Sequence, residues 1–212
     1  MIHVYALTDS PEAPLPEVAG IAGASVEQLA VGGLCAVCSR HPDPAELTVS
    51  EAQLWAHEAV VEALLGDRAV LPVRYGSDFG DEQGLRRAVE AGREGYEADL
   101  RRLRGRVEFG VRAFPSGERR QSGSTGREYL ATRASETAEA REVHERLMGL
   151  AVEATVAPPA GRAVLTAGYL VARDAADAFT AEVEGLARKS SRIELLCTGP
   201  WPPYSFVTQA AA

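Results

Sequence analysis

Short apolar runs along the first forty residues predict strands. Ile2–Leu7 is an apolar run closed by Asp9, and it predicts a buried strand. Two further runs, Ser25–Val31 and Leu34–Ser39, are joined by Gly32-Gly33. Two glycines between strands favour a type I′ turn, because both central residues need positive φ. The pattern therefore predicts a strand followed by a β-hairpin.

A helix, a strand and a longer helix are predicted next. Thr48–Glu51 has the spacing of a capping box. Behind it an apolar stripe interrupted by one histidine predicts a helix that ends at Gly66; its members are Leu54, His57, Val61 and Leu64. Ala69–Tyr75 predicts a strand, and Pro72 places it at an edge or bulge because proline donates no ladder hydrogen bond. A second helix begins near Asp81 and ends at Gly105; its stripe is Leu85, Val89, Gly92, Tyr96, Leu100 and Leu103.

The second half repeats this alternation after a polar segment. Val107–Phe114 predicts a strand, and the Gly/Ser-rich segment Pro115–Gly126 predicts a mobile linker or a loop tip. Arg127–Glu153 predicts a helix with a firm stripe only late, at Ala140, Val143, Leu147 and Leu150. Val164–Ala172 predicts a strand, and Asp174 is placed to cap a helix with an inner face of Ala176, Phe179, Val183 and Leu186. Ile193–Cys197 predicts the last strand.

These elements indicate an α+β protein with helices on one face of each sheet. The nearest simple template is a pair of small ferredoxin-like α/β sandwich domains, joined by the Ser/Gly-rich linker and a long helix. We predict an N-terminal α+β domain over residues 1–115 and a flexible linker over 116–126. Residues 127–212 are then a helix followed by a ferredoxin-like domain.

Composition and charge narrow the classes of function. The net charge is −8, which argues against nucleic acid or anionic membrane as the main partner. The three cysteines are too few for a disulfide scaffold. The start lacks a signal-peptide pattern, and no stretch approaches the roughly 18 apolar residues of a spanning helix. We therefore expect a cytoplasmic, reduced protein.

Cysteines and histidines do not assemble into a known motif in the sequence. On a strand, Cys35 and Cys38 point to opposite faces, so a structural role is favoured over zinc or redox chemistry. Trp55–Glu58 begins like a zincin helix, but Val61 stands where the second histidine is needed. His57 is therefore interpreted as lying at the edge of the apolar stripe and hydrogen-bonded locally. The other histidines, His3, His41 and His144, are scattered and have no evident Ser, Asp or Cys partner.

Motifs for nucleophilic catalysis and for phosphate binding also fail. Ser122–Gly126 misses the G-x-S-x-G pattern at its first position, and no strand precedes it. No G-x-G-x-x-G or Walker A spacing occurs. We expect no catalytic, cofactor or metal site.

The C-terminal segment Thr198–Phe206 concentrates aromatic residues in a chain where they make up only 6%. Its prolines hold Trp201, Tyr204 and Phe206 in a restricted backbone, which suits recognition because rigid aromatics lose little entropy on binding. Equally, Trp201 and Phe206 could fill the core of the chain's own domain. Both interpretations stay open.

The whole chain resembles the gas vesicle protein GvpF/GvpL family. The segments that carry the resemblance run in order along the sequence: Val4–Leu7, Gly33–Ser39, His57–Phe79, Val107–Val111, Tyr129-Leu130 and the closing TGPWPPYSFV. Tyr75 replaces the usual phenylalanine after the LPxR of the middle segment, and Ser77 replaces a common threonine.

The resemblance implies a non-catalytic accessory protein of gas vesicle assembly, with two ferredoxin-related α+β domains. It also implies contact with the small hydrophobic shell subunit and with other accessory proteins. As candidate contact residues we take the aromatic tail and the neighbouring sheet edge: Arg74, Tyr75, Trp201, Pro202, Pro203, Tyr204 and Phe206. An enzyme should instead show a deep polar pocket, and a small-ligand sensor should show a closed apolar cavity.

Overall fold

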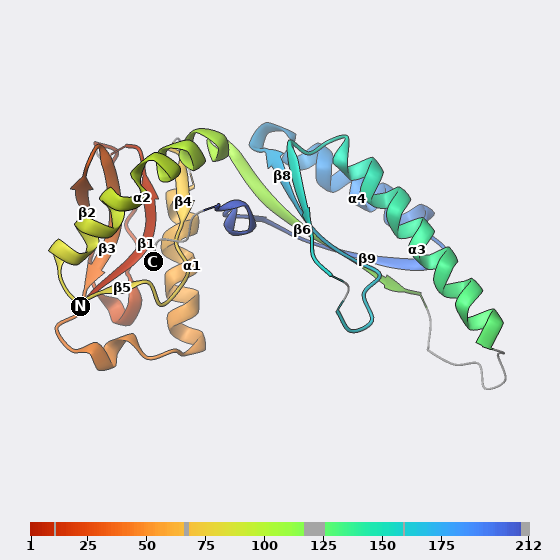
Figure 1. Ribbon diagram of the computed structural model, residues 1–212, viewed down its shortest axis with the longest axis horizontal. Helices are drawn as coiled ribbons and strands as arrows, with labels where there is room; N and C mark the ends of the chain where they lie inside the picture. The colour runs from red at the N-terminus through yellow and green to blue at the C-terminus, as the bar shows by residue number, and fades with distance from the viewer. Residues whose placement is uncertain (11, 66–67, 117–125, 159, 209–212) are drawn as a thin grey trace. The chain divides into compact units, whose positions relative to one another are not determined.

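The computed structural model describes residues 1–10, 12–65, 68–116, 126–158 and 160–208 (Figure 1). It contains two sheets with helices packed on them, as the α+β prediction requires. The chain divides into two compact units: unit 1 is Met1–Gly105 with Pro202–Ala212, and unit 2 is Arg106–Trp201. Unit 2 is therefore an insertion in unit 1, because the chain leaves unit 1 once and returns to it.

This division differs from the predicted boundary at residues 116–126. The strand β6 (Arg106–Pro115) pairs along its length with β8 and β9, so it belongs to unit 2 rather than to the N-terminal unit. The last residues return to unit 1 because their side chains pack on it. Residues 117–125 of the predicted linker lie outside the described residues.

The sheet of unit 1 has the strand order β2-β3-β1-β4, with β5 also pairing with β1. These strands are β1 (Ile2–Thr8), β2 (Val26–Val31), β3 (Leu34–Arg40), β4 (Val70–Pro72) and β5 (Asp78–Phe79). Gly32 and Gly33 have φ of 57° and 89°, as the predicted hairpin turn requires. Pro72 lies on β4 at the edge of the sheet, where its missing N–H costs no ladder hydrogen bond.

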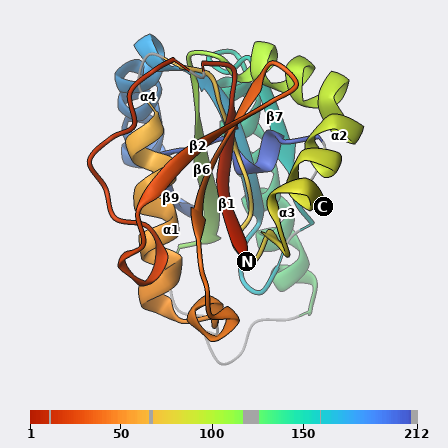
Figure 2. The ribbon, with the colours of Figure 1, turned by 90° about the vertical axis from the view of Figure 1, so that its left-hand side faces the viewer.

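Two helices, α1 (Glu51–Leu64) and α2 (Glu82–Leu103), lie on opposite sides of this sheet (Figure 2). Every residue of β1 is buried, because both faces of the strand are covered. The helix cap of α1 is Ser50, whose Oγ accepts from Gln53 N; the predicted cap Thr48 instead ends the 3₁₀ turn Pro44–Leu47. Leu54 of the predicted stripe is 41% exposed, because it lies at the margin of the buried face.

Unit 2 has the β-α-β-β-α-β element order of the ferredoxin-like motif, with strand order β7-β8-β6-β9. After β6 come α3 (Gly126–Met148), β7 (Glu153–Val156), β8 (Leu165–Ala172), α4 (Ala176–Lys189) and β9 (Ile193–Trp201). The prediction that Asp174 caps α4 is wrong, since Asp174 lies in the preceding 3₁₀ turn and Ala175 takes the cap position without a side-chain bond. The long helix α3 ends before Leu150, and it packs into the core of unit 2 through Ala140, Val143 and Leu147.

Unit 1 departs from the ferredoxin-like order at its first connection. Between β1 and β2 the chain forms only the short 3₁₀ turn Ile21–Gly23 instead of a helix. Pro14 and Pro16 in this connection remove backbone donors and interrupt helix formation. The helix on the second face of the sheet is supplied by α2, which follows β5 in the chain.

Candidate functional site

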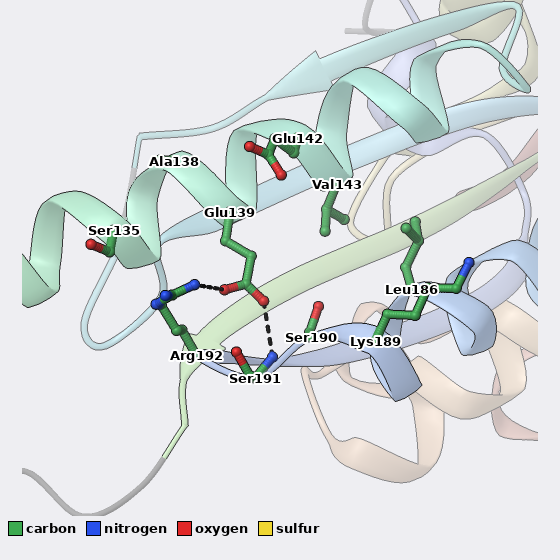
Figure 3. Close-up of a pocket in the computed structure, with 10 residues that line it drawn as sticks. All are labelled: Ser135, Ala138, Glu139, Glu142, Val143, Leu186, Lys189, Ser190, Ser191 and Arg192. Carbon is green, nitrogen blue, oxygen red and sulfur yellow. Dashed lines mark hydrogen bonds and ion pairs between the residues drawn. The ribbon is translucent and has the colours of Figure 1, made fainter.

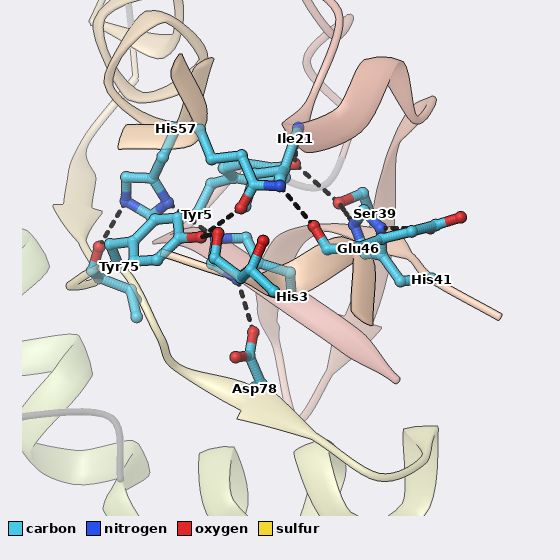
Figure 4. A network of polar contacts seen from close by, with 12 residues as sticks. His3, Tyr5, Ile21, Ser39, His41, Glu46, His57, Tyr75 and Asp78 are labelled. Atoms are coloured by element: carbon cyan, nitrogen blue, oxygen red, sulfur yellow. Dashed lines mark hydrogen bonds and ion pairs between the residues drawn. The ribbon is translucent and has the colours of Figure 1, made fainter. Parts of the chain in front are cut away.

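A buried network of polar side chains joins β1 to α1 in unit 1 (Figure 4). His3 and Tyr5 are two residues apart on β1, so both point to the face that α1 covers. His3 Nε2 lies 2.8 Å from His57 Nδ1, and His3 Nδ1 lies 2.6 Å from Asp78 Oδ1 on β5. His57 Nε2 lies 2.9 Å from the carbonyl oxygen of Val73. The network therefore links β1, β5 and the residue that follows β4 to His57 of α1.

The acceptors in this chain of contacts fix where the protons are. A carbonyl oxygen only accepts, so His57 donates from Nε2 to Val73 and, when neutral, accepts at Nδ1 from His3 Nε2–H. His3 Nδ1 and Asp78 Oδ1 lie 2.6 Å apart, within hydrogen-bond distance. Asp78 therefore helps to hold the ring of His3 where its other nitrogen reaches His57.

Burial sets the protonation of the two histidines. His57 is 1% exposed, and burial, reinforced by the neighbouring charge of His3, lowers the pKa of His57 to about 4. Burial likewise lowers the pKa of His3, while the hydrogen bond to Asp78 and the charge of that carboxylate oppose the change. His57 is therefore neutral at neutral pH.

A second branch of the network has the connectivity of a Ser–His–Glu triad. Ser39 Oγ lies 2.8 Å from His41 Nε2, and His41 Nδ1 lies 3.1 Å from Glu46 Oε2. Tyr5 Oη lies 2.7 Å from Ser39 Oγ and accepts a hydrogen bond of 2.9 Å from Ile21 N. A nucleophile must reach its substrate, but Ser39 is 0% exposed. The geometry therefore assigns this branch to holding the backbone of unit 1 in place.

The sequence interpretation of the histidines as scattered is wrong for His3 and His41. The structure pairs His3 with Asp78, which is 75 residues away, and His41 with Ser39. The sequence signal that could have revealed them is the period-2 spacing of His3 and Tyr5 on an otherwise apolar strand. Nothing in the sequence showed which distant carboxylate would meet them.

The cysteines occupy buried positions, as the structural interpretation expected. Cys35 and Cys38 are free thiols on β3 and are 0% exposed. Burial, followed by the charge of Glu27, raises the pKa of Cys38 to about 12, which keeps its thiol protonated and unreactive. Across the described ranges, no group of three or more His, Cys, Asp and Glu side chains is arranged to hold a metal ion.

Two of the predicted contact residues lie at the surface end of the network. Arg74 is exposed. Tyr75 is half-buried: its ring contacts those of His3 and His57, and its hydroxyl donates to Gln53 Oε1 at 2.7 Å. Tyr75 thus connects the buried histidines to the surface beside the N-terminus of α1.

The other predicted contact residues divide between the two units. Trp201 ends β9 in unit 2 and is 40% exposed. The following residues 202–208, which we call the C-terminal strap, pack on unit 1. Pro202, Pro203 and Phe206 are buried, and Tyr204 packs against the core cluster around Tyr5 and Val60. The structure therefore places the strap's apolar side chains in the chain's own core and leaves Trp201 accessible.

Polar contacts with α2 anchor the end of the strap. Asp99 is 2% exposed, and its Oδ2 accepts from the backbone N and from Oγ1 of Thr208, both at 2.8 Å. The guanidinium of Arg102 donates to Asp99 and to the carbonyl oxygen of Phe206. Burial would raise the pKa of Asp99, but the hydrogen bonds from Arg102 and Thr208 outweigh it and lower that pKa.

A cavity of about 480 Å³ lies in unit 2 between α3 and the segment that joins α4 to β9 (Figure 3). Most of its lining is polar or charged: Ser135, Glu139, Glu142, Lys189, Ser190, Ser191 and Arg192. Glu139 accepts from Ser191 N at 3.1 Å and forms an ion pair of 3.5 Å with Arg192. This lining differs from the closed apolar cavity expected of a small-ligand sensor.

The helices within the described ranges include none that is both long and apolar enough to cross a membrane.

Comparison with known proteins gives one consistent family. The sequence model described as "Gas vesicle synthesis protein GvpL/GvpF" matches residues 1–208. Gas vesicle protein L of Streptomyces sp. (strain CB03234) is 34% identical, over 96% of this chain and 91% of its own length. Gas vesicle protein F2 of Halobacterium salinarum is 30% identical, over 97% of this chain and 91% of its own length.

Solved structures share the fold. The crystal structure of GvpF from Anabaena sp. PCC7120 superposes with a TM-score of 0.80 at 19% identity, covering 99% of this chain and 96% of that one. The crystal structure of GvpF from Microcystis aeruginosa gives a TM-score of 0.75 at 15% identity, covering 98% and 99%. With the full-length sequence match, these findings show that the chain belongs to the GvpL/GvpF family of gas vesicle proteins.

Proposed function

We propose that this protein is a non-catalytic accessory factor of gas vesicle assembly. It binds the small hydrophobic shell subunit and other vesicle proteins in the cytoplasm, at the growing vesicle. A shell subunit with an apolar face aggregates unless that face is covered. An acidic partner with net charge −8 can cover it while remaining dispersed by its own charge.

The observation that carries this proposal is the exposure of Trp201 at the end of an edge strand. Tryptophan buries a large apolar area and is enriched in the energetic centres of protein interfaces. Trp201 is 40% exposed, whereas the strap that follows it is fixed by burial and by Asp99. Within unit 2 the backbone of Trp201 pairs with Glu108 on β6 while the indole stays accessible, which lowers the entropy cost of binding.

The buried network supports the absence of catalysis. Its nucleophile Ser39 and the imidazoles of His3, His41 and His57 are at most 1% exposed. The described cavity in unit 2 is lined by residues other than these. The buried histidines and Ser39 are therefore separate from this accessible space, whereas an active site brings its nucleophile and base to a place that substrate can reach.

Each unit offers a contact surface of its own. In unit 1 the exposed Arg74 and the half-buried Tyr75 form the first, and in unit 2 Trp201 forms the second. Pro202, Pro203, Tyr204 and Phe206 act indirectly in this proposal, because their packing holds the chain in place next to Trp201.

Co-purification of the shell subunit with tagged chain tests the proposal. Trp201→Ala and Arg74→Ala should each lower the amount of shell subunit recovered, and the double variant should lower it most. Leu130→Ala is the matched control, since Leu130 is 67% exposed on α3 and lies outside both surfaces. Point substitutions are preferable to truncation, because residues 202–208 pack on unit 1.

Full recovery of the shell subunit by the double variant would remove these two surfaces from the proposal. Failure of the wild-type chain to bind the shell subunit under any assembly condition would overturn the proposed function itself. Circular dichroism of each variant establishes that a loss of binding does not come from unfolding.

A further inference from the structure

Helix α1 is apolar on its exposed face as well as on its buried face. Its core side consists of His57, Val60, Val61 and Leu64. On the opposite side, at helical spacing, lie exposed residues that are small or aromatic: Ala52, Trp55, Ala59 and Ala63. Trp55 is 63% exposed. A surface helix normally turns polar residues outward, so a second apolar face indicates that another surface covers it.

A row of acidic side chains borders this outer face. Glu51, Glu58 and Glu62 follow one another at spacings of seven and four residues, which places them along one side of Trp55. In the part of the chain that the structure describes, no ion pair with an arginine or lysine is found for any of the three. The helix itself contains no arginine or lysine.

Each of the other long helices pairs at least one of its acids with an arginine of the same helix. Ion pairs at i,i+4 join Arg86 to Glu82 on α2, Arg141 to Glu145 on α3, and Arg188 to Glu184 on α4. On α1 the same spacing joins the like charges Glu58 and Glu62, which repel each other. The acidic row of α1 is therefore uncompensated within the helix.

We propose that the outer face of α1 docks an amphipathic helix of a partner protein that carries a row of lysine or arginine beside its apolar stripe. The apolar stripe packs on Trp55 and the alanines, whose small side chains let the two backbones approach closely. The basic row then faces Glu51, Glu58 and Glu62. This site is distinct from the surfaces at Arg74, Tyr75 and Trp201, and it names the chemistry of a partner for the proposed accessory function.

The electrostatics of Glu58 agree with this occupant. Burial is the main cause that raises the pKa of Glu58, and the negative charge of Glu62 adds to it. A cationic side chain docked between these carboxylates offsets their mutual repulsion. An anionic partner would increase it, so the charge pattern selects for positive partners.

Designed peptides provide the probe. One is an amphipathic helix of about 18 residues, long enough to fold on binding, with an Ala/Leu stripe beside a row of lysines. The second carries glutamate at each lysine position. Isothermal titration calorimetry with the full chain gives affinity and stoichiometry. A Trp201→Phe background leaves Trp55 as the sole tryptophan, so its emission reports whether the peptide reaches α1.

Two variants and a charge-matched control locate the binding surface. Trp55→Ala removes the apolar centre, and Glu51→Lys/Glu62→Lys reverses the acidic row at two exposed positions. Glu90→Lys/Glu94→Lys changes the net charge by the same amount on the exposed side of α2. We expect one-to-one binding of the lysine peptide, a blue shift of Trp55, and a loss of about tenfold in affinity for each α1 variant. The α2 variant should bind as the wild type does.

Several results would overturn the proposal. An equal loss in the α2 variant means that the peptide follows net charge alone. Unchanged affinity in Trp55→Ala, or no saturable binding, excludes the outer face of α1. Self-association of the chain that Trp55→Ala abolishes would show that a second copy covers this face. The shell subunit is absent from these titrations, so their outcome is separate from that of the co-purification.

Discussion

Acid should destabilise unit 1 through His57. Its imidazole donates to a backbone carbonyl and accepts from His3 in a site that is 1% exposed. Burial lowers the pKa of His57 from its ordinary value of 6.5 to about 4. Between these two pH values His57 binds a proton in the unfolded chain and stays neutral in the folded chain. Protonation therefore favours unfolding, and stability falls as the pH falls.

The size of the effect follows from the pKa difference. Each pKa unit corresponds to about 1.4 kcal/mol, so the interval between 6.5 and about 4 amounts to about 3 kcal/mol at full titration. About 2 kcal/mol of this is lost between pH 7.5 and pH 5.0. Burial lowers the pKa of His3 as well, so His3 contributes in the same direction. Above pH 6.5 the contribution of His57 is complete, and stability should no longer depend on this group.

Urea unfolding at a series of pH values measures the effect. In a Trp201→Phe background the fluorescence of Trp55 reports unit 1, because Trp55 lies on the same helix as His57. His57→Gln should lower stability at pH 7.5 through lost hydrogen bonds and flatten the dependence between pH 7.5 and 5.0. His144→Gln, which removes a histidine of unit 2, should leave the dependence in place. An unchanged pH dependence in His57→Gln would refute the assignment of the acid sensitivity to this residue.

Other substitutions test packing and hydrogen bonding, each by thermal unfolding followed with circular dichroism. Tyr5→Phe removes the hydroxyl that accepts from Ile21 N and should cost about 1–3 kcal/mol, because a buried N–H loses its partner; a change below 0.5 kcal/mol would mean that water replaces the hydroxyl. Gly92→Ala should lower the melting temperature although alanine is the better helix former, because the new Cβ would lie 2.5 Å from the ring of Tyr96. Gly185→Ala on α4 meets no atom closer than 4.0 Å and should stabilise by about 1 kcal/mol; equal effects of the two alanines would contradict the steric argument.

The sequence predicted correctly those elements that depend on neighbouring residues alone. The glycine pair of the first hairpin required positive φ at both positions, and the structure confirms the turn. The apolar stripe of α2 identified its buried side from Leu85 to Leu103. Pro72 indicated an edge strand, since a missing donor is tolerated there. The glycine pair and Pro72 each restrict the backbone locally, and the apolar stripe restricts which side of its helix can be exposed.

The histidine network and the division into units were missed because both depend on distant pairing. Asp78 meets His3 only because the two-residue strand β5 pairs with the start of β1. No periodicity is detectable in two residues. The polar segment at 116–126 suggested a boundary, but strand pairing assigns β6 to unit 2 and packing returns the strap to unit 1. Composition alone does not indicate which strand a segment pairs with.

The buried and the exposed face of α1 have different roles, so substitutions on one face can be tested separately from those on the other. On the inner face His57 binds a carbonyl and excludes charge, while on the outer face Trp55 is exposed beside carboxylates that no cation of the helix neutralises. The inner hydrogen bonds fix the helix to the sheet, so the outer face is presented in a set position and loses little entropy on docking. Docking on α1 should therefore be independent of pH between 7.5 and about 5, because His57 of the folded chain stays neutral until its pKa of about 4 is approached.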